Sequence, residues 1–346
     1  GFAVTKKKLS IRFNNLPNST YVFIVAFVLA SVIVPNFLTP GNLTTMLTQA
    51  CVMMILSTAM SMCLMMGCID LSLGGMVSMT GVIIAILLKN GVHAGIAILA
   101  GILSGTAFGM FNGFVVTKMK VPPFIATFGA SGIAQSIANT ISQERTISWE
   151  QGGHVKLINM LGSNILTVYF GPRPAQILAV SALLVITVII LVIVLVLFKK
   201  TTLGSNLYAL GANEETARLS GIDNVKWKVG IYALSGFLAS LAGMIVMIRT
   251  NSLQPTVGDG LEFQAVVAAV LGGNSMKGGK GSVPGAILGA LTLYTVRNAM
   301  SLWGIDTSVV MVVIGCILVF GMILNQAVNS LAEKQKLYKN AEGKGA

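Results

Sequence analysis

The segment Lys199–Lys228 reads KKTTLGSNLYALGANEETARLSGIDNVKWK and interrupts an otherwise apolar chain with a charged, patterned stretch. Within it, Leu203, Leu207 and Leu210 recur at i, i+4 and i+7, which places the three side chains on one face of a helix. A helix with one apolar face can lie on a membrane surface with its polar face toward water. The segment therefore predicts a helical surface element between two sets of apolar segments.

A second short helix is predicted in the same segment. Asn213 is a favourable N-cap, and Glu214 and Glu215 fall in the first turn, where the positive end of the helix dipole favours acids. We expect glycines to break the helix on both sides, at Gly211 and Gly221. Such a hairpin suits docking to a soluble partner, while a surface helix without a docking role is the alternative. Its outward face is expected to carry Glu214, Glu215 and Arg218.

Composition excludes a soluble globular protein, because 54% of the 346 residues are hydrophobic and only 10% are charged. We expect an all-α, polytopic membrane protein that forms one transmembrane domain over residues 1–346. The fifth, eighth and ninth of about ten predicted spans are Gly-rich, polar or short, so we expect some of them to be broken or re-entrant. The spans are Leu16–Pro35, Thr45–Gly67, Leu71–Leu88, His93–Val116, Val121–Ile141, Ala175–Phe198, Val229–Ile248, Leu261–Gly273, Gly281–Ala299 and Thr307–Gln326.

The distribution of basic residues predicts the orientation in the membrane. With the N-terminus placed in the cytoplasm, 17 of the 23 Lys and Arg residues fall on the inner side, so both termini and the loop 199–228 are expected to be cytoplasmic. The net charge of +12 follows from this bias and from anionic inner-leaflet lipid, and it gives no reason to expect a nucleic acid partner. The longest external loop is predicted at 142–174, with a short helix in it.

Two glycine ladders predict close helix packing. They lie in the fourth and ninth spans, with spacings of four residues, and if spans two to five and seven to ten are repeats related by inversion, the ladders occupy equivalent positions. The alternative is that glycine is simply common in membrane helices. The ladder residues are Gly101, Gly105, Gly109, Gly113, Gly281, Gly285 and Gly289.

The sequence argues against catalysis by this chain. The stretch GGNSMKGGKGS resembles a phosphate loop, but the pattern would need glycine at Asn274 and Ser or Thr at Gly281. Two His and eleven acidic residues offer no Ser-His-Asp set, and the four Cys have no zinc spacing, so we expect no enzyme, metal site or cofactor. ATP and Mg²⁺ would be bound by a separate partner.

Asp70 is the one acid placed between two apolar spans with almost no loop between them. An ionisable group there suggests a direct part in a translocation path. The alternative is a helix cap, in which Asp70 or Ser72 accepts backbone N–H groups at the start of the third span. Both roles are compatible.

The fifth span begins with VPPFIATFG and then carries hydroxyl and amide side chains along its length. The double proline suits a helix start, where missing N–H donors do least harm. Polar side chains facing lipid are costly, so they are expected to face a cavity, where a neutral hydroxyl-rich solute would find partners, or to bond other helices. The path candidates, with Asp70 and Ser72, are Phe124, Thr127, Ser131, Gln135 and Asn139.

Four motifs resemble those of ribose-type ATP-binding cassette permeases, the membrane subunits of bacterial importers for monosaccharides and related small polar solutes. GCIDLSLGG (67–75) resembles the G-x-I-D-L-S-x-G signature, and VPPFIATFG (121–129) resembles V-P-x-F-I-x-T-L-G. LGSNLYALGANEETARLSGI (203–222) resembles the cytoplasmic coupling segment, and VLGGNSMKGGKGSVPGAILGAL (270–291) resembles the late glycine-rich segment. Phe128 and Cys68 depart from the usual Leu and Gly, which bears on packing more than on class.

The resemblance implies a bacterial inner-membrane permease with three kinds of partner. These are a cytoplasmic ATP-binding cassette ATPase, an external solute-binding protein and a second permease subunit, identical or not. In the coupling segment it places Gly211, Asn213, Glu214, Ala217, Ser220 and Gly221 in the ATPase cleft, and the charge pattern adds Glu215 and Arg218. An ion-coupled secondary transporter is the alternative, although intramembrane carboxylates are scarce here. The solute is left open.

Overall fold

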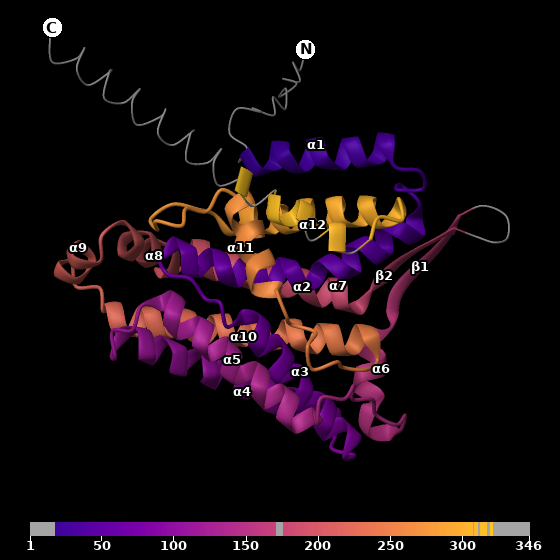
Figure 1. The fold of residues 1–346 in the computed structure, drawn as a ribbon, viewed down its shortest axis with the longest axis horizontal. Coiled ribbons are helices and arrows are strands. Elements are labelled where there is room, and N and C mark those ends of the chain that lie inside the picture. The colour runs from indigo at the N-terminus through magenta and orange to yellow at the C-terminus, as the bar shows by residue number, and fades with distance from the viewer. Residues whose placement is uncertain (1–17, 171–175, 307, 311, 317–318, 321–346) are drawn as a thin grey trace, which may run out of the picture.

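The computed structural model describes residues 18–170, 176–306, 308–310, 312–316 and 319–320. Helices account for the first nine predicted spans, and the tenth lies largely outside the described residues. Figure 1 shows the long helices running side by side, with α8 and α9 at one end and a β-hairpin at the other. The nine helices are α1 (Asn18–Ile33), α2 (Pro40–Met65), α3 (Leu73–Lys89), α4 (Ala94–Thr117), α5 (Pro123–Ser142), α7 (Ala182–Lys200), α10 (Asn224–Thr250), α11 (Leu261–Leu271) and α12 (Val283–Leu302).

Four described helices, α2, α4, α7 and α10, are long and apolar enough to cross a membrane by length and composition. In the most apolar 18-residue stretch of α2 and of α10, 83% of the residues are buried, against 28% in α4 and α7. A helix that is apolar all round and buried lies at the centre of a bundle, whereas one with an exposed apolar face borders lipid. α2 and α10 are therefore the central helices.

The two central helices are covered crosswise. α3 and α4 pack on α10, whereas α11 and α12 pack on α2. Thus the second and third helices of each predicted repeat pack on the first helix of the other repeat. This exchange is the arrangement expected of two interlocked inverted repeats.

The glycine ladder of α4 makes the close contacts that its spacing predicts. A Cβ at Gly105 would collide with the Ser240 hydroxyl of α10, and one at Gly109 would collide with the Tyr232 carbonyl. In α12, Gly285 and Gly289 approach backbone carbonyls of α11 and its C-cap in the same way. Gly281 was wrongly assigned to this helix, because Ser282 is the N-cap and the ladder proper begins inside α12.

Two predicted interruptions are absent, and the third is real. α5 and α12 are unbroken helices of 20 residues each, because their glycines and prolines lie where they do not disturb the helical ladder. α11 has only 11 residues, about 16 Å of helix, which is roughly half of a hydrocarbon core. The loop before it turns back into the protein, where Gly258 N–H donates to the Ser78 hydroxyl of α3 at 2.9 Å.

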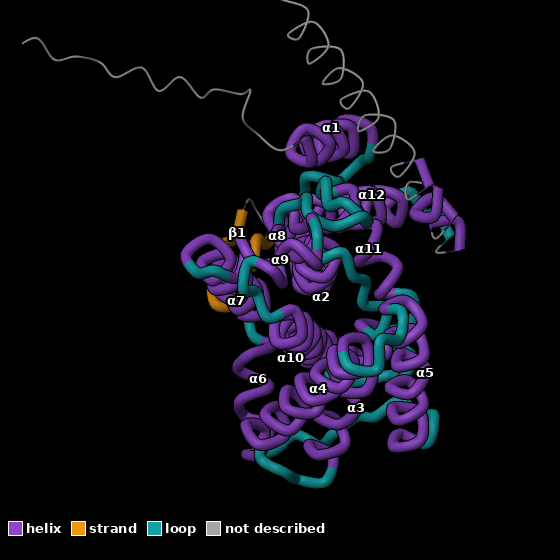
Figure 2. The backbone as a smooth tube through the Cα atoms, turned by 90° about the vertical axis from the view of Figure 1, so that its left-hand side faces the viewer, coloured by secondary structure: helices purple, strands orange, loops and turns teal. Residues whose placement is uncertain are grey.

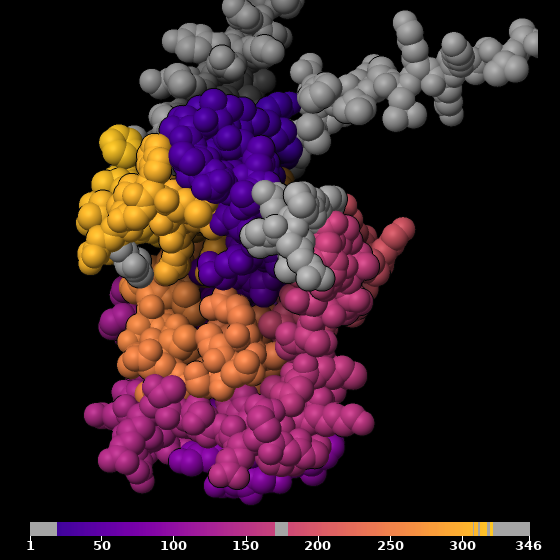
Figure 3. Space-filling model, turned by 90° about the vertical axis from the view of Figure 1, so that its right-hand side faces the viewer, coloured from indigo at the N-terminus to yellow at the C-terminus, as the bar shows by residue number. Residues whose placement is uncertain are grey.

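The predicted external loop contains η2 (Gly153–Val155), the expected short helix α6 (Lys156–Gly162) and the strand β1 (Asn164–Phe170). β1 forms an unexpected antiparallel hairpin with β2 (Gln176–Ser181), which occupies the start of the predicted sixth span. The sixth span therefore begins at Ala182 and not at Ala175. β-Branched and aromatic residues in NILTVYF favour an extended chain. Ser181 sets the helix start, because its hydroxyl accepts the Leu184 N–H at 3.2 Å. Figure 3 views this end of the molecule.

Candidate functional site

Asp70 lies in the turn between α2 and α3 and is fully buried. One carboxylate oxygen accepts the Ser72 N–H at 3.0 Å and the Ser72 hydroxyl at 2.5 Å. The other accepts the Ser235 hydroxyl of α10 at 2.5 Å. Charge-assisted hydrogen bonds of this kind are about twice as strong as neutral ones. Asp70 therefore ties the α2–α3 turn to the central helix α10.

The network continues from Asp70 into one more helix, α4, and makes a second contact with α10. The Asn112 amide of α4 donates to the Ser72 hydroxyl at 2.8 Å, and the Tyr232 hydroxyl of α10 donates to the Ile69 carbonyl at 3.1 Å. Ser72 is the N-cap of α3 but makes no side-chain cap bond, and Asp70, two residues earlier, accepts the Ser72 N–H in an Asx turn. The geometry of both residues is that of a brace between helices.

We expect Asp70→Ala to lower the free energy of unfolding by roughly 3 kcal/mol, because each orphaned buried hydroxyl donor costs about 1–3 kcal/mol. The fraction of detergent-solubilised protein that remains in solution after heating measures this loss of stability. Asp70→Asn keeps the shape and an acceptor, so it should be affected less. Poor transport by a variant of unchanged thermal stability would instead assign Asp70 to the translocation path.

The two glycines after this turn let α3 approach two neighbours. A Cβ at Gly74 would collide with the Glu262 carboxylate of α11, and one at Gly75 would lie 2.5 Å from the Ser131 carbonyl of α5. Glu262 is only 9% exposed and sits in the first turn of α11. The sequence analysis did not single out Glu262, although an acid inside a predicted span was signal enough.

Two polar residues of α5, Thr127 and Gln135, bond other parts of the chain. Thr127 is fully buried, and its hydroxyl accepts the Leu71 N–H at 3.0 Å. The Gln135 amide donates to the Pro255 carbonyl at 2.8 Å and to the Asn139 side chain at 3.1 Å. These contacts hold α5 to the α2–α3 turn and to the loop before α11. For these residues the structure therefore shows hydrogen bonds to other segments, the alternative to side chains that face a cavity. The Gln135 Oε1 atom is buried without a hydrogen-bond partner among the described residues.

The opposite face of α5 is open. Phe124 and Phe128 are each 55% exposed, and their rings stack with centroids 6.1 Å apart. A Cβ at Gly129 or at Gly132 would meet nothing within 4 Å. A shallow groove follows this face and is lined by Gly129, Gly132, Ile133, Ser136, Ile137, Thr140 and Ile141. Among the path candidates, Phe124 alone is exposed on this face, while Thr127 is buried on the other.

The polar hairpin consists of α8 (Leu203–Ala212) and α9 (Glu214–Leu219), and Figure 2 looks onto it. Leu207 and Leu210 are buried as their spacing predicts. The Asn213 side chain accepts the Thr216 N–H at 2.8 Å, which confirms the predicted N-cap. Gly221 follows α9 with φ +85°, a left-handed conformation that suits glycine at a helix stop.

The charges of α9 divide into an inner pair and an outer pair. Glu214 bonds Lys228 at 2.6 Å, and Lys228 is only 13% exposed, so this pair fixes α9 to the start of α10. Glu215 and Arg218 pair at 2.6 Å on the outer face, and their hydrogen bond raises the pKa of Arg218. Leu219 beside them is 78% exposed. The outer face therefore offers two charges and an apolar side chain that the sequence analysis did not select.

Two predicted coupling residues point inward. Gly211 lies inside α8 and is no break, since the helix continues to Ala212. A Cβ there would collide with the Met65 carbonyl and the Gly279 N–H. Ala217 is buried at 3% exposure. Small residues at these two positions let the hairpin pack closely against the chain beneath it. Glu215, Arg218 and Ser220, by contrast, are exposed.

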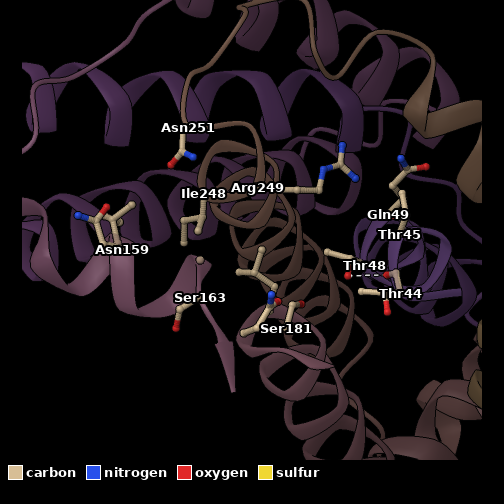
Figure 4. Close-up of a pocket in the computed structure, with 14 residues that line it drawn as sticks. Thr44, Thr45, Thr48, Gln49, Asn159, Ser163, Ser181, Ile248, Arg249 and Asn251 are labelled. Atoms are coloured by element: carbon tan, nitrogen blue, oxygen red, sulfur yellow. Dashed lines mark hydrogen bonds between the residues drawn. The ribbon is translucent and has the colours of Figure 1, made fainter. Parts of the chain in front are cut away.

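A polar cavity of about 500 Å³ lies at the other end of the molecule. Figure 4 shows Thr44, Thr48 and Gln49 of α2 on one side and Arg249 and Asn251, at the end of α10, on the other. No acid lines it, and Arg249 forms no ion pair with any residue that the structure describes. The cavity therefore presents unneutralised positive charge.

The described part of the chain holds no group of three or more His, Cys, Asp or Glu residues that could bind a metal ion. Cys51, Cys63 and Cys68 are buried as free thiols, and Cys316 is exposed. The buried carboxylates Asp70 and Glu262 have helix-packing partners in place of a nucleophile or a base.

Comparison with known proteins places the chain. Residues 42–322 match the family described as branched-chain amino acid transport system / permease component. The chain is 33% identical over 302 residues to the ribose import permease of Bacillus subtilis (strain 168), covering 87% of this chain and 90% of that protein. It is also 33% identical over 305 residues to the L-arabinose permease of Escherichia coli (strain K12), covering 88% of each chain.

A third relative is the D-allose permease of Escherichia coli (strain K12), which is 29% identical over 312 residues and covers 89% of this chain and 91% of its own. No solved structure matches. The resemblance to ribose-type permeases found in the motifs is confirmed. The chain is a multi-pass membrane protein that belongs to the family of branched-chain amino acid transport system permease components.

Proposed function

We propose that this chain is the membrane-spanning permease subunit of an ATP-driven importer for a monosaccharide. The relatives named above import ribose, L-arabinose and D-allose, which are all small neutral polyhydroxy aldehydes. A separate cytoplasmic ATPase binds ATP and Mg²⁺ and drives the cycle.

The α8–α9 hairpin carries this proposal. It presents Glu215, Arg218 and Leu219 on an exposed face, while Leu207, Leu210 and Ala217 anchor it from beneath. Because these buried residues fix the hairpin to the rest of the protein, a force applied to its exposed face moves the attached helices and does not merely deform the hairpin. Aliphatic side chains between charges also suit a small, specific docking contact, in which the charges set register and the apolar group contributes affinity.

The open face of α5 is the best candidate for one wall of the translocation path. It combines the exposed hydroxyls of Ser136 and Thr140 with the flat stacked rings of Phe124 and Phe128. Aromatic faces and hydroxyls are suitable partners for a sugar, which has both C–H and O–H surfaces. A second permease subunit, identical or related, would supply the facing wall.

The external end suits contact with a solute-binding protein. Arg249 faces the polar cavity without a counter-charge among the described residues, so it can pair with an acidic side chain of such a partner. The excess of basic residues on the side of the α8–α9 hairpin favours a cytoplasmic position for that end and for both termini, in a bacterial inner membrane.

Uptake measurements test the energy source. Cells that express the complete transporter should take up labelled ribose, L-arabinose or D-allose in the presence of a protonophore and should stop when ATP is depleted. An ion-coupled secondary transporter would behave in the opposite way. A chain that takes up one of these sugars after reconstitution alone, driven only by an ion gradient, would overturn the proposal.

A further inference from the structure

The glycine-rich loop 272–282, GGNSMKGGKGS, connects α11 to α12 and fails as a phosphate loop. In the structure it lies against α8 and the end of α2, and in Figure 1 it is the orange loop beside α8. Gly279 N–H donates to the Met65 carbonyl at 2.9 Å, which joins the loop directly to the last turn of α2. The loop is therefore packed under the hairpin and is not a free connection.

The contact between the loop and α8 is made by backbone atoms. A Cβ at Gly278 would lie 2.7 Å from the Gly211 carbonyl and 2.8 Å from Gly67 Cα. A Cβ at Gly279 would lie 3.0 Å from Ala212 Cα. Real Cβ atoms do not come within 3.0 Å of other atoms, so glycine is needed at Gly278 and at Gly211, whereas at Gly279 a shift of a few tenths of an ångström would admit a side chain. Backbones in contact leave no flexible side chain to absorb relative motion.

Hydrogen bonds hold the loop on both sides of this contact. The Tyr208 hydroxyl of α8 donates to the Gly281 carbonyl at 2.6 Å. Asn274 is fully buried and accepts the Ser61 hydroxyl of α2 at 2.8 Å and the Ser282 N–H at 3.0 Å. A fully satisfied buried amide of this kind fixes one arrangement of the loop. The hairpin, the end of α2 and the loop are thus bonded in three places.

The tip of the loop faces outward beside the hairpin. Met276 is 43% exposed, and Lys277 and Lys280 are exposed. These lysines are the loop's only charged residues, and neither forms an ion pair with a described residue. The tip is therefore a cationic surface with one apolar side chain, and it lies next to the C-terminal end of α8.

We propose that this tip is a second docking contact for the ATPase, and that the loop and the α8–α9 hairpin move as one rigid body. The inference rests on the proposed function, because the partner is the same ATPase. The cationic tip fits an acidic patch on that partner. A push on the hairpin then reaches α11 and α12 directly through the loop, in addition to α7 and α10.

Charge reversal tests the contact. Lys277→Glu combined with Lys280→Glu should weaken binding of the purified ATPase by about tenfold or more, because like charges replace attraction. Lys89→Glu with Lys156→Glu is the matched control, since it makes the same charge change near the opposite end and should bind as the parent does. Unchanged binding by the loop variant overturns the second contact. If the parent chain itself binds no ATPase, the proposed function fails instead.

A cross-link tests the rigid body. A Cβ added at Gly279 would lie 3.3 Å from the Ala212 Cβ, a few tenths of an ångström short of the roughly 3.5–4.5 Å of a disulfide, so a small shift would suit the bond. With Cys316→Ser removing the exposed thiol, Ala212→Cys and Gly279→Cys should join on oxidation, and thiol labelling before and after reduction measures the joined fraction. Sugar uptake should match that of the same reduced variant. Uptake that stops on oxidation and returns with reductant would show that the two parts must separate.

Discussion

Gly105→Leu will prevent stable folding of the permease. The leucine side chain would enter the contact between α4 and α10, where the nearest atoms are the Ser240 hydroxyl, the Thr80 methyl and the Gly236 carbonyl. A backbone carbonyl cannot move aside as a rotamer can, so the cost should exceed the about 1–3 kcal/mol of ordinary overpacking. The yield of monodisperse protein in size-exclusion chromatography measures the effect.

Gly230→Leu is the matched control for this substitution. Gly230 also lies in a membrane helix, α10, but a Cβ there meets nothing within 4 Å. The control should be recovered at the parent's yield, because leucine is the better helix former. If Gly105→Leu is recovered equally well and transports sugar, the two helices do not depend on this close approach.

The second large effect is expected at α9. Exchanging its outer charges, Glu215→Lys with Arg218→Glu, keeps an i,i+3 ion pair and reverses the pattern that a partner meets. Adding Leu219→Asp removes the exposed apolar group. We expect the triple variant to lose ATPase co-purification, or to uncouple ATP hydrolysis from uptake, at unchanged abundance in the membrane.

The inner pair provides the contrast. Glu214→Lys breaks its bond to the largely buried Lys228 and should lower thermal stability, which separates a structural defect from a docking defect. Reversing all charges of α9 together would mix the two effects. A triple variant that binds the ATPase and transports like the parent would remove the docking role from this face.

Local pattern was enough to predict most of the helices and the start of α9. Examples are the apolar runs, the double proline at α5 and the Asn213 cap. Each acts through residues close by in the chain, so each can be recognised from the sequence. The β-hairpin was not predicted, because β1 fell within the expected external loop and the apolar β2 resembles the start of a membrane helix. Only Ser181 marked the true beginning of α7.

Contacts between distant segments were the part that sequence could not supply. Gly211 resembled a helix break. Glycine is required there because the backbone of residues 278–279, far along the chain, lies directly against it. Asp70 was recognised as unusual, but its bonds to Ser235 and, through Ser72, to Asn112 depend on how helices cross. Glu262 could have been singled out as an acid inside a predicted span, but its contact with Gly74 becomes meaningful only once α3 and α11 are known to lie side by side.

The crosswise packing of the central helices also constrains how the chain can be made. Asn42 and Asn298 exchange two side-chain hydrogen bonds at 2.8 Å across 256 residues of sequence. During synthesis α2 emerges early, but α11 and α12, which cover it, leave the ribosome near the end of translation. Until then, the surface of α2 that they cover must contact lipid or an insertion factor. A truncated chain would leave this surface open to incorrect contacts.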